Sequence, residues 1–344
     1  MTPASTQASL DGAQESPPKA LTVTAIVIAA ELTDFGRRCM AHLLELPEQP
    51  EVLFVPDEPV DGLDPRIKMI PSGLGAVLGE KRQIGLENAS GEVVAQIDDD
   101  AYPHSSWLRI ATSALARDPE IVAVVGPNLT PPTDSPLERL SGDVYASRLV
   151  SGPDPWAYRI AGERDVADAP GANLVIRRAE ALEIGYEGGV GEDTRFLNEL
   201  VARGLRIRYL PAAIVFHSRR PLWRRHLRQL FRWSRARSAS ARALRGNSLQ
   251  PTFFAPSALL IAIASGAVVR GRLQRVWRGG MLAYLVCCIA AGASRSPGRW
   301  WRLSLAIAAT HVVYGFGFLQ GMLGASPPER APQGEQPPSP PVPR

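Results

Sequence analysis

The chain has 344 residues, 45% of them hydrophobic and 21% charged, with a formal net charge of +4. These values are ordinary for a globular protein, and the length leaves room for one large domain and an appendage. Three cysteines, Cys39, Cys287 and Cys288, exclude a disulfide framework and favour a reducing compartment.

The charges are unevenly distributed along the chain. Thirteen arginines and no acidic residue lie between Arg203 and Arg245, whereas nearly all Asp and Glu residues precede Leu200. An acidic first part followed by a basic segment indicates a metal or polar catalytic site joined to a region that meets anions. Phosphates, nucleic acid and a membrane surface are the candidate anions.

Residues 1–20 are rich in Ser, Pro, Gln and Ala and predict a disordered leader without the features of a secretion signal. Apolar runs predict strands at Leu21–Ala30, Glu51–Val55, Arg66–Ile70, Glu92–Ile97 and Ile121–Val125. Amphipathic spacing predicts intervening helices at Phe35–Leu46, Ala76–Ala89 and Ser105–Ala116. This alternation predicts an α/β fold with a mainly parallel sheet covered on both faces, whose ligands bind beyond the carboxyl ends of the strands.

The alternation is interrupted at Pro127–Ala169, where only one helix, around Leu137–Leu149, is expected. It then resumes with strands at Ala172–Arg177, Leu205–Tyr209 and Ala213–His217 and a helix at Glu192–Arg203. We therefore place one α/β domain at residues 21–218.

A basic helix is predicted at Pro221–Gly246, within a segment that we assign to residues 219–250. Its arginines alternate with a set of apolar and aromatic residues, namely Leu222, Trp223, Leu227, Leu230, Phe231 and Trp233. This composition favours a helix lying on a membrane surface. The alternative is a helix that packs on the domain and exposes a solvated basic face.

Residues 251–325 contain three apolar segments, Phe253–Val269, Gly279–Ala293 and Leu303–Leu323, none of which carries a charge. As helices they would measure roughly 25, 22 and 31 Å, so only the last spans a bilayer core of about 30 Å comfortably. We expect them to meet lipid, with the first or the middle segment interfacial or re-entrant. A Pro-rich tail, residues 326–344, is expected to be disordered.

Asp98, Asp99 and Asp100 follow directly after the predicted strand Glu92–Ile97. Adjacent carboxylates repel one another unless a cation is present, and clusters of oxygen ligands suit Mg²⁺ or Mn²⁺. The end of a strand is also where a parallel-sheet enzyme would hold a metal and a diphosphate. The alternative is a solvated acidic turn before Pro103.

Three stretches together resemble the inverting family 2 glycosyltransferases of GT-A fold. The first runs from Glu80-Lys81-Arg82 through Gly91–Pro103, with its strand-ending Asp-x-Asp pattern, to Trp107-Leu108. The second is Gly171–Arg178 followed by Gly191–Thr194, with a Glu-Asp pair. The third, Gln229–Trp233, fits the Gln-x-x-Arg-Trp signature of membrane-bound polysaccharide synthases such as cellulose, chitin and hyaluronan synthases. The resemblance extends over roughly Leu21 to Leu323.

The resemblance implies a role for each of these positions. A divalent metal, Mn²⁺ or Mg²⁺, is expected at Asp98 and Asp100, with His217 contacting the metal or the diphosphate. The nucleoside-diphosphate sugar is expected to meet Asp57, Arg82, Asp98 and Asp99. Asp193, with Glu192 beside it, is the expected base for the acceptor hydroxyl. Gln229, Arg232 and Trp233 are expected at the diphosphate and the acceptor sugar.

Plainer alternatives remain for these residues. A Glu-Asp pair at a helix start is ordinary capping chemistry, a lone His is more often structural, and Gln229–Trp233 also fits a surface helix. The first strand ends in Ala29-Ala30-Glu31, without the aromatic residue that relatives pack on the nucleotide base.

We predict an enzyme at the inner or plasma membrane whose catalytic domain faces the cytoplasm, and which transfers a sugar to a lipid-linked or growing glycan acceptor. The alternatives are a processive polysaccharide synthase and an inactive membrane scaffold for glycan assembly. A nucleic-acid partner is disfavoured, because no nucleic-acid module is recognisable.

Overall fold

The computed structural model describes residues 20–152, 155–189, 191–242 and 249–324. The predicted leader, except Ala20, and the predicted Pro-rich tail lie outside these residues. So does the end of the predicted basic helix, at residues 243–246.

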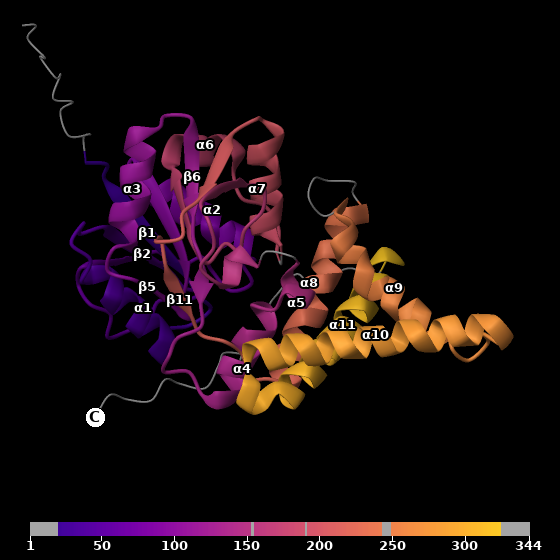
Figure 1. Cartoon of the computed structure of the whole chain (residues 1–344). Coiled ribbons are helices and arrows are strands. Elements are labelled where there is room, and N and C mark those ends of the chain that lie inside the picture. The colour runs from indigo at the N-terminus through magenta and orange to yellow at the C-terminus, as the bar shows by residue number, and fades with distance from the viewer. Residues whose placement is uncertain (1–19, 153–154, 190, 243–248, 325–344) are drawn as a thin grey trace, which may run out of the picture.

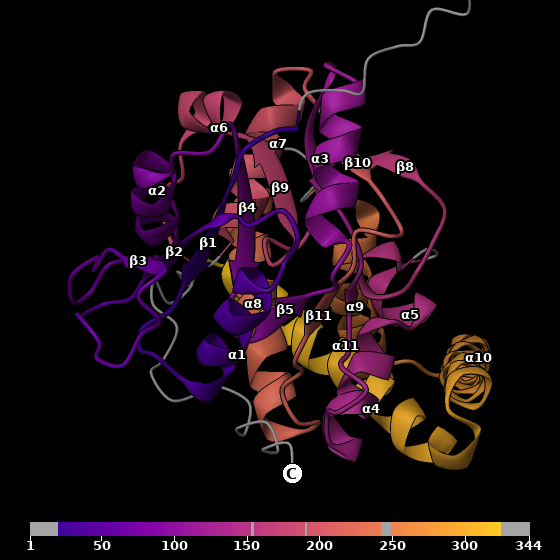
Figure 2. The ribbon, with the colours of Figure 1, turned by 90° about the vertical axis from the view of Figure 1, so that its left-hand side faces the viewer.

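An eight-stranded sheet forms the centre of the first part of the chain, with strand order β3-β2-β1-β4-β9-β6-β10-β8 (Figure 2). Its strands are β1 (Val23–Ile28), β2 (Glu51–Val55), β3 (Ile67–Met69), β4 (Val93–Asp98), β6 (Ile121–Val125), β8 (Arg164–Val166), β9 (Leu174–Arg177) and β10 (Arg206–Tyr209). Strands β1, β2, β3 and β4 pair in parallel, as do β6 and β10. Strand β9 is antiparallel to β4 and β6, and β8 is antiparallel to β10. The sheet is therefore mixed, with a parallel part that contains the acidic strand end.

Helices cover both faces of the sheet, because alternate strand residues point to opposite sides. Ala25 and Val27 of β1 pack in one core cluster with α1 (Asp34–Leu44) and α3 (Trp107–Arg117). Ile26 and Ile28 pack in a second cluster on the other face. This second cluster includes α2 (Leu78–Asn88), α6 (Arg178–Ile184) and α7 (Glu192–Ala202). The expectation of a sheet buried on both faces is confirmed.

A small sheet of order β5-β11-β7 follows the acidic turn. It consists of β5 (Ala101–Pro103), β7 (Asn128–Leu129) and β11 (Val215–His217). In its antiparallel register His217 lies opposite Ala101. The sheet therefore brings the end of the predicted domain back to the carboxyl end of β4.

The segment between β7 and β9 contains α4 (Pro136–Tyr145), α5 (Arg148–Ser151) and a 3₁₀ turn, η1 (Trp156–Tyr158). A single helix was expected at Leu137–Leu149, and this is corrected. Ser147 has extended backbone angles, and its side chain accepts a hydrogen bond from the Leu149 amide at 3.3 Å. This N-cap ends the first helix and starts the second.

The remaining helices are α8 (Arg224–Arg242), α9 (Pro251–Ser265), α10 (Gly271–Arg295), the 3₁₀ turn η3 (Pro297–Arg299) and α11 (Trp300–Met322). Figure 1 shows them gathered on one side of the sheet domain, with α10 extending away from it. A third apolar cluster joins α10 and α11 to α4 through Leu140, Val144, Cys288, Leu303 and Ile307. Helix α8 buries His226, Leu230 and Ser234 and packs along α11.

Among the described residues, Gly271–Arg295 and Pro297–Met322 are long and apolar enough to cross a membrane by length and composition. The expectation that only the last segment is long enough is thus corrected. Arg272, Arg275 and Arg278, which precede the predicted apolar segment Gly279–Ala293, form the first turns of α10. Arginine has a high helix propensity, so these charges interrupt the apolar run without ending the helix.

Candidate active site

The acidic turn and β11 bring three candidate metal ligands together. Strand β4 ends at Asp98 and β5 begins at Ala101, so Asp99 and Asp100 form the turn between them. His217 Nε2 lies 2.9 Å from Asp100 Oδ1. One ligand atom from each of Asp98, Asp100 and His217 lies within 4.8 Å of the other two. Carboxylate and imidazole ligands in this arrangement fit a divalent transition metal such as Mn²⁺.

Asp100 is buried between His217 and Arg220. Burial raises the pKa of its carboxyl, but the nearby His217 and Arg220 outweigh that effect and hold the pKa well below its usual range. Arg220 Nη1 forms an ion pair with Asp100 Oδ2, and the backbone amide of Ser218 donates to the Asp100 carbonyl at 3.0 Å. Asp100 is therefore a carboxylate at neutral pH, which a metal ligand must be.

The guanidinium of Arg82, on α2, connects the acidic turn to α7. Its Nη2 lies 3.1 Å from Asp98 Oδ1 and its Nε 3.0 Å from Glu192 Oε1. Its Nη1 donates to Gln96 Oε1 at 2.8 Å. Because the Arg82 side chain is only 4% exposed, this network holds Asp98 and Glu192 in fixed relation.

Helix α7 presents Glu192 and Asp193 at its first turn. Gly191 precedes them with φ of 89°, a left-handed conformation that favours glycine. Glu192 is buried against Arg82, and burial together with the neighbouring Asp193 raises the pKa of its carboxyl to about 7. Asp193 is half-buried, and its Oδ2 accepts a hydrogen bond from the Gly171 amide at 3.0 Å. Glu192 is thus the buried member of the pair, in contact with Arg82, and Asp193 is the more accessible carboxylate.

Asp57, the expected contact of the nucleotide base, follows β2 and forms an ion pair with Lys81. Lys81 is itself buried and donates to the carbonyl of Ala29 at 2.6 Å. Lys81 therefore ties the ends of β1 and β2 to α2.

The three residues of the third motif lie on α8, beside α4. Gln229 Oε1 accepts from the Tyr145 hydroxyl at 3.2 Å. The ring of Trp233, which is 37% exposed, lies 5.9 Å from that of Tyr145, whereas Arg232 is half-buried. Arg219, two residues after His217, places its guanidinium 5.5 Å from the same tyrosine ring. Tyr145 therefore joins the motif on α8 to the segment that carries His217.

Sequence reasoning did not assign a role to Arg220, Lys81 or the ion pair between Arg237 and Asp168, whose Nη1 and Oδ2 are 2.6 Å apart. Lys81 stands beside Arg82 in the first motif, and its position there is a signal that could have been used. Arg220 was counted only as one of many arginines. Nothing local in the sequence marks the partnership of Asp168 with Arg237, because these residues are 69 positions apart.

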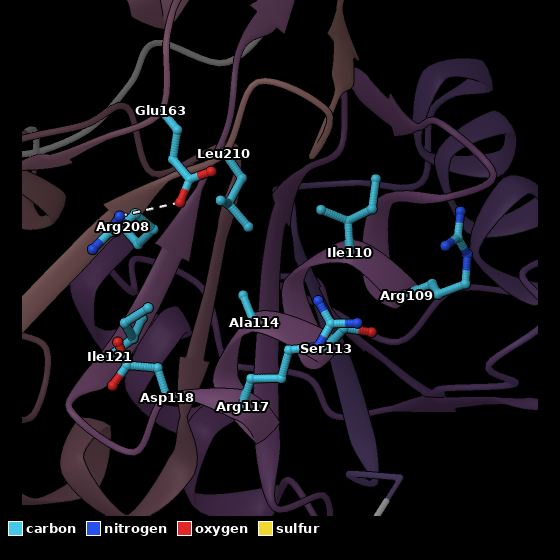
Figure 3. Close-up of a pocket in the computed structure, with 10 residues that line it drawn as sticks. All are labelled: Arg109, Ile110, Ser113, Ala114, Arg117, Asp118, Ile121, Glu163, Arg208 and Leu210. Atoms are coloured by element: carbon cyan, nitrogen blue, oxygen red, sulfur yellow. Dashed lines mark hydrogen bonds and ion pairs between the residues drawn. The ribbon is translucent and has the colours of Figure 1, made fainter. Parts of the chain in front are cut away.

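A cavity of about 420 Å³ lies elsewhere, against α3, β6 and β10 (Figure 3). Its lining includes Arg109, Arg117 and Leu210, together with Arg208 in an ion pair with Glu163. None of the predicted site residues lines it, so it is distinct from the cluster around Asp100.

Comparisons with known proteins indicate the family to which the chain belongs. Residues 93–319 match Glycosyl transferase family group 2. A probable glycosyltransferase, YdaM of Bacillus subtilis, is 25% identical over 176 residues, which are 49% of this chain and 41% of that protein. The chain thus spans less than half the length of this relative.

Among solved structures, the fold is similar to that of the mannosyltransferase PcManGT from Pyrobaculum calidifontis, a complex with GDP-Man and Mn²⁺. The TM-score is 0.58 at 18% sequence identity, with 88% of each chain covered. At this identity the likeness establishes the fold, which is GT-A-like. Because the family match covers most of the chain, the protein belongs to glycosyl transferase family group 2.

Proposed function

We propose that the protein is a metal-dependent, inverting glycosyltransferase that moves a sugar from a nucleoside-diphosphate sugar to a lipid-linked or growing glycan acceptor. The observation that carries this proposal is the chain of contacts from the cluster of Asp98, Asp100 and His217 through Arg82 to Glu192, beside Asp193. These contacts link a candidate cation site to the helix turn that carries the accessible carboxylate of Asp193.

In this proposal Asp98, Asp100 and His217 hold Mn²⁺, or Mg²⁺ in its place. The bound metal would neutralise charge on the departing diphosphate. PcManGT was solved with GDP-Man and Mn²⁺, so GDP-mannose and Mn²⁺ are the first pair to test. Arg220, which now pairs with Asp100, supplies a further positive group that suits a diphosphate by its forked donors.

Asp193 is the proposed base. The acceptor hydroxyl attacks the anomeric carbon of the donor sugar while the carboxylate of Asp193 takes the hydroxyl proton. The bond from that carbon to the diphosphate oxygen breaks, and its electron pair leaves with the nucleoside diphosphate. Asp193 suits this role better than Glu192, since it is half-buried while Glu192 is engaged by Arg82.

We propose that the side of the active site that binds the acceptor lies next to the membrane. Helix α10 exposes large apolar side chains such as Leu282, Leu285 and Ile289, a surface that soluble monomers rarely present. Its carboxyl end is tied to the catalytic domain by Arg295, which lies 3.1 Å from Asp143 of α4. Arginines lie at both ends of α10, Arg272, Arg275 and Arg278 at its amino end and Arg295 at its carboxyl end, so the positive-inside rule does not assign its orientation. From the exposed apolar surface of α10 we propose residence in the inner or plasma membrane. A catalytic domain on the cytoplasmic side is part of the same proposal.

Direct metal titration tests the site. We expect the detergent-solubilised protein to bind Mn²⁺, measured by loss of the free-ion electron paramagnetic resonance signal. Asp100→Asn should weaken binding by at least about tenfold, because it removes the charge of a ligand. Asp64→Asn, at an exposed carboxylate paired with Arg66, is the matched control and should leave binding unchanged. Equal Mn²⁺ affinity for the wild-type protein and Asp100→Asn would reject this metal site.

A further inference from the structure

The backbones of α8 and α11 lie so close together that only small residues fit between them at the closest points. A Cβ added at Gly317 would lie 2.8 Å from the carbonyl oxygen of Phe231, and one at Gly321 would lie 3.0 Å from that of Arg235. Ser234 and Ser238 of α8 face the same two glycines. Small residues at such a contact let two helix backbones approach and set their register. The position of α8 is therefore determined by α11.

From this helix, Arg237 reaches into the catalytic domain. Its Nη1 lies 2.6 Å from Asp168 Oδ2, and both side chains are only 20% exposed. The guanidinium also stacks over the ring of Phe253, 4.6 Å from its centroid, near the start of α9. Arg237 thus joins the C-terminal helices to the segment that precedes β9.

That segment contacts the first turn of α7 at two neighbouring residues, Asp193 and Thr194. Asp168 Oδ1 accepts a hydrogen bond from Thr194 Oγ1 at 3.4 Å, next to Asp193 in α7. Three residues after Asp168, the amide of Gly171 donates to Asp193 Oδ2. A Cβ added at Gly171 would lie 3.0 Å from Asp193 Cβ. The backbone at Gly171 therefore lies so close to Asp193 that a larger residue would crowd it. A shift of Asp168 would therefore be transmitted to the carboxylate of Asp193.

We propose that Arg237 and Asp168 are positioning residues for the transfer step, through which the α8–α11 layer sets the orientation of Asp193. This inference rests on the proposed role of Asp193 as the base. The orientation of a reacting group matters because a displacement of about 1 Å can cost about 10²-fold in rate. An acceptor that approaches along the C-terminal helices would then meet a base held by those same helices.

The test compares transfer with donor binding in the full-length protein. We expect Arg237→Gln and Asp168→Asn each to lower kcat by about 10- to 100-fold, with donor affinity unchanged within about twofold, because the pair does not contact the donor side. The double variant should be no slower than the slower single variant, since both changes break one interaction. Arg237→Lys should recover most of the rate. Arg224→Gln, at an exposed arginine of the same helix, is the control and should keep the wild-type rate.

Additive effects in the double variant, or a parallel loss of donor affinity, would show a merely structural pair and overturn the proposal. Should Arg237→Gln not fold, Asp168→Asn and Arg237→Lys decide the question, since each nearly preserves side-chain volume. Asp193→Asn is measured alongside. If it abolishes transfer while the pair variants keep the wild-type rate, the positioning proposal alone fails. If Asp193→Asn transfers sugar normally, the proposed base is wrong and the positioning proposal falls with it.

Discussion

The Asp193→Asn variant should transfer sugar about 10²- to 10⁴-fold more slowly than the wild-type protein. The amide keeps the shape of the side chain and can still accept the hydrogen bond from the Gly171 amide, but it cannot take a proton from the acceptor hydroxyl. Donor binding should remain within about twofold of the wild-type affinity, because the metal cluster is untouched. Single-turnover transfer and donor binding, measured separately, check this result.

Glu199→Gln provides the matched control for Asp193→Asn. Glu199 lies on the exposed side of the same helix, in an ion pair with Arg203. Its replacement should leave transfer unchanged, because exposed pairs of this kind contribute little. Transfer by Asp193→Asn at a rate close to that of Glu199→Gln would show that another group accepts the proton.

Arg82→Met should lower the free energy of unfolding at pH 8 by about 3–5 kcal/mol. The substitution leaves the carboxylates of Glu192 and Asp98 without their shared partner, and Glu192 is only 4% exposed. Urea unfolding of both proteins, followed by intrinsic fluorescence, measures the difference. Arg66→Met, which breaks an exposed pair with Asp64, is the control and should cost less than about 1 kcal/mol.

The destabilisation by Arg82→Met should depend on pH with a definite sign. Burial raises the pKa of Glu192 in the folded protein to about 7, whereas in the unfolded chain it is about 4.3. The folded state therefore binds this proton more tightly, and the associated stability is lost as pH rises through 7. Near pH 5 the folded protein holds Glu192 neutral, so Arg82→Met should cost less there than at pH 8. An equal or larger cost at pH 5 would contradict this account of the Arg82–Glu192 pair.

Much of the fold could be predicted from local pattern. The strands Glu51–Val55 and Ile121–Val125 were predicted with the bounds that the structure has, because continuous apolar runs between turn residues read clearly as buried strands. The short strands β5 and β7 were not predicted, since two or three residues carry no periodicity. The start of α10 was missed because arginines interrupt its apolar run, although they continue its helix.

The residues of the candidate site could likewise be predicted from the sequence only in part. Asp98 and Asp100 could be identified because adjacent carboxylates after a strand carry a local signal. His217 was identified only by resemblance, and its place beside Asp100 depends on the register of β11 with β5. Arg220 and the Arg237–Asp168 pair could not be predicted, because their partners lie 120 and 69 residues away in the chain. Contacts of this kind are decided by how helices and sheets pack, and sequence spacing does not record them.

Binding of nucleotide sugars to the detergent-solubilised protein, with Mn²⁺ and with EDTA, tests the central claim most directly. A panel containing GDP-mannose and the common UDP-sugars would be titrated against the wild-type protein and Asp100→Asn. We predict that one donor binds in the presence of Mn²⁺, and that its binding is lost both with EDTA and in Asp100→Asn. Binding that is indifferent to EDTA and to Asp100→Asn, or failure of every donor to bind the folded, metal-loaded protein, would contradict a metal-dependent transferase built on Asp98, Asp100 and His217.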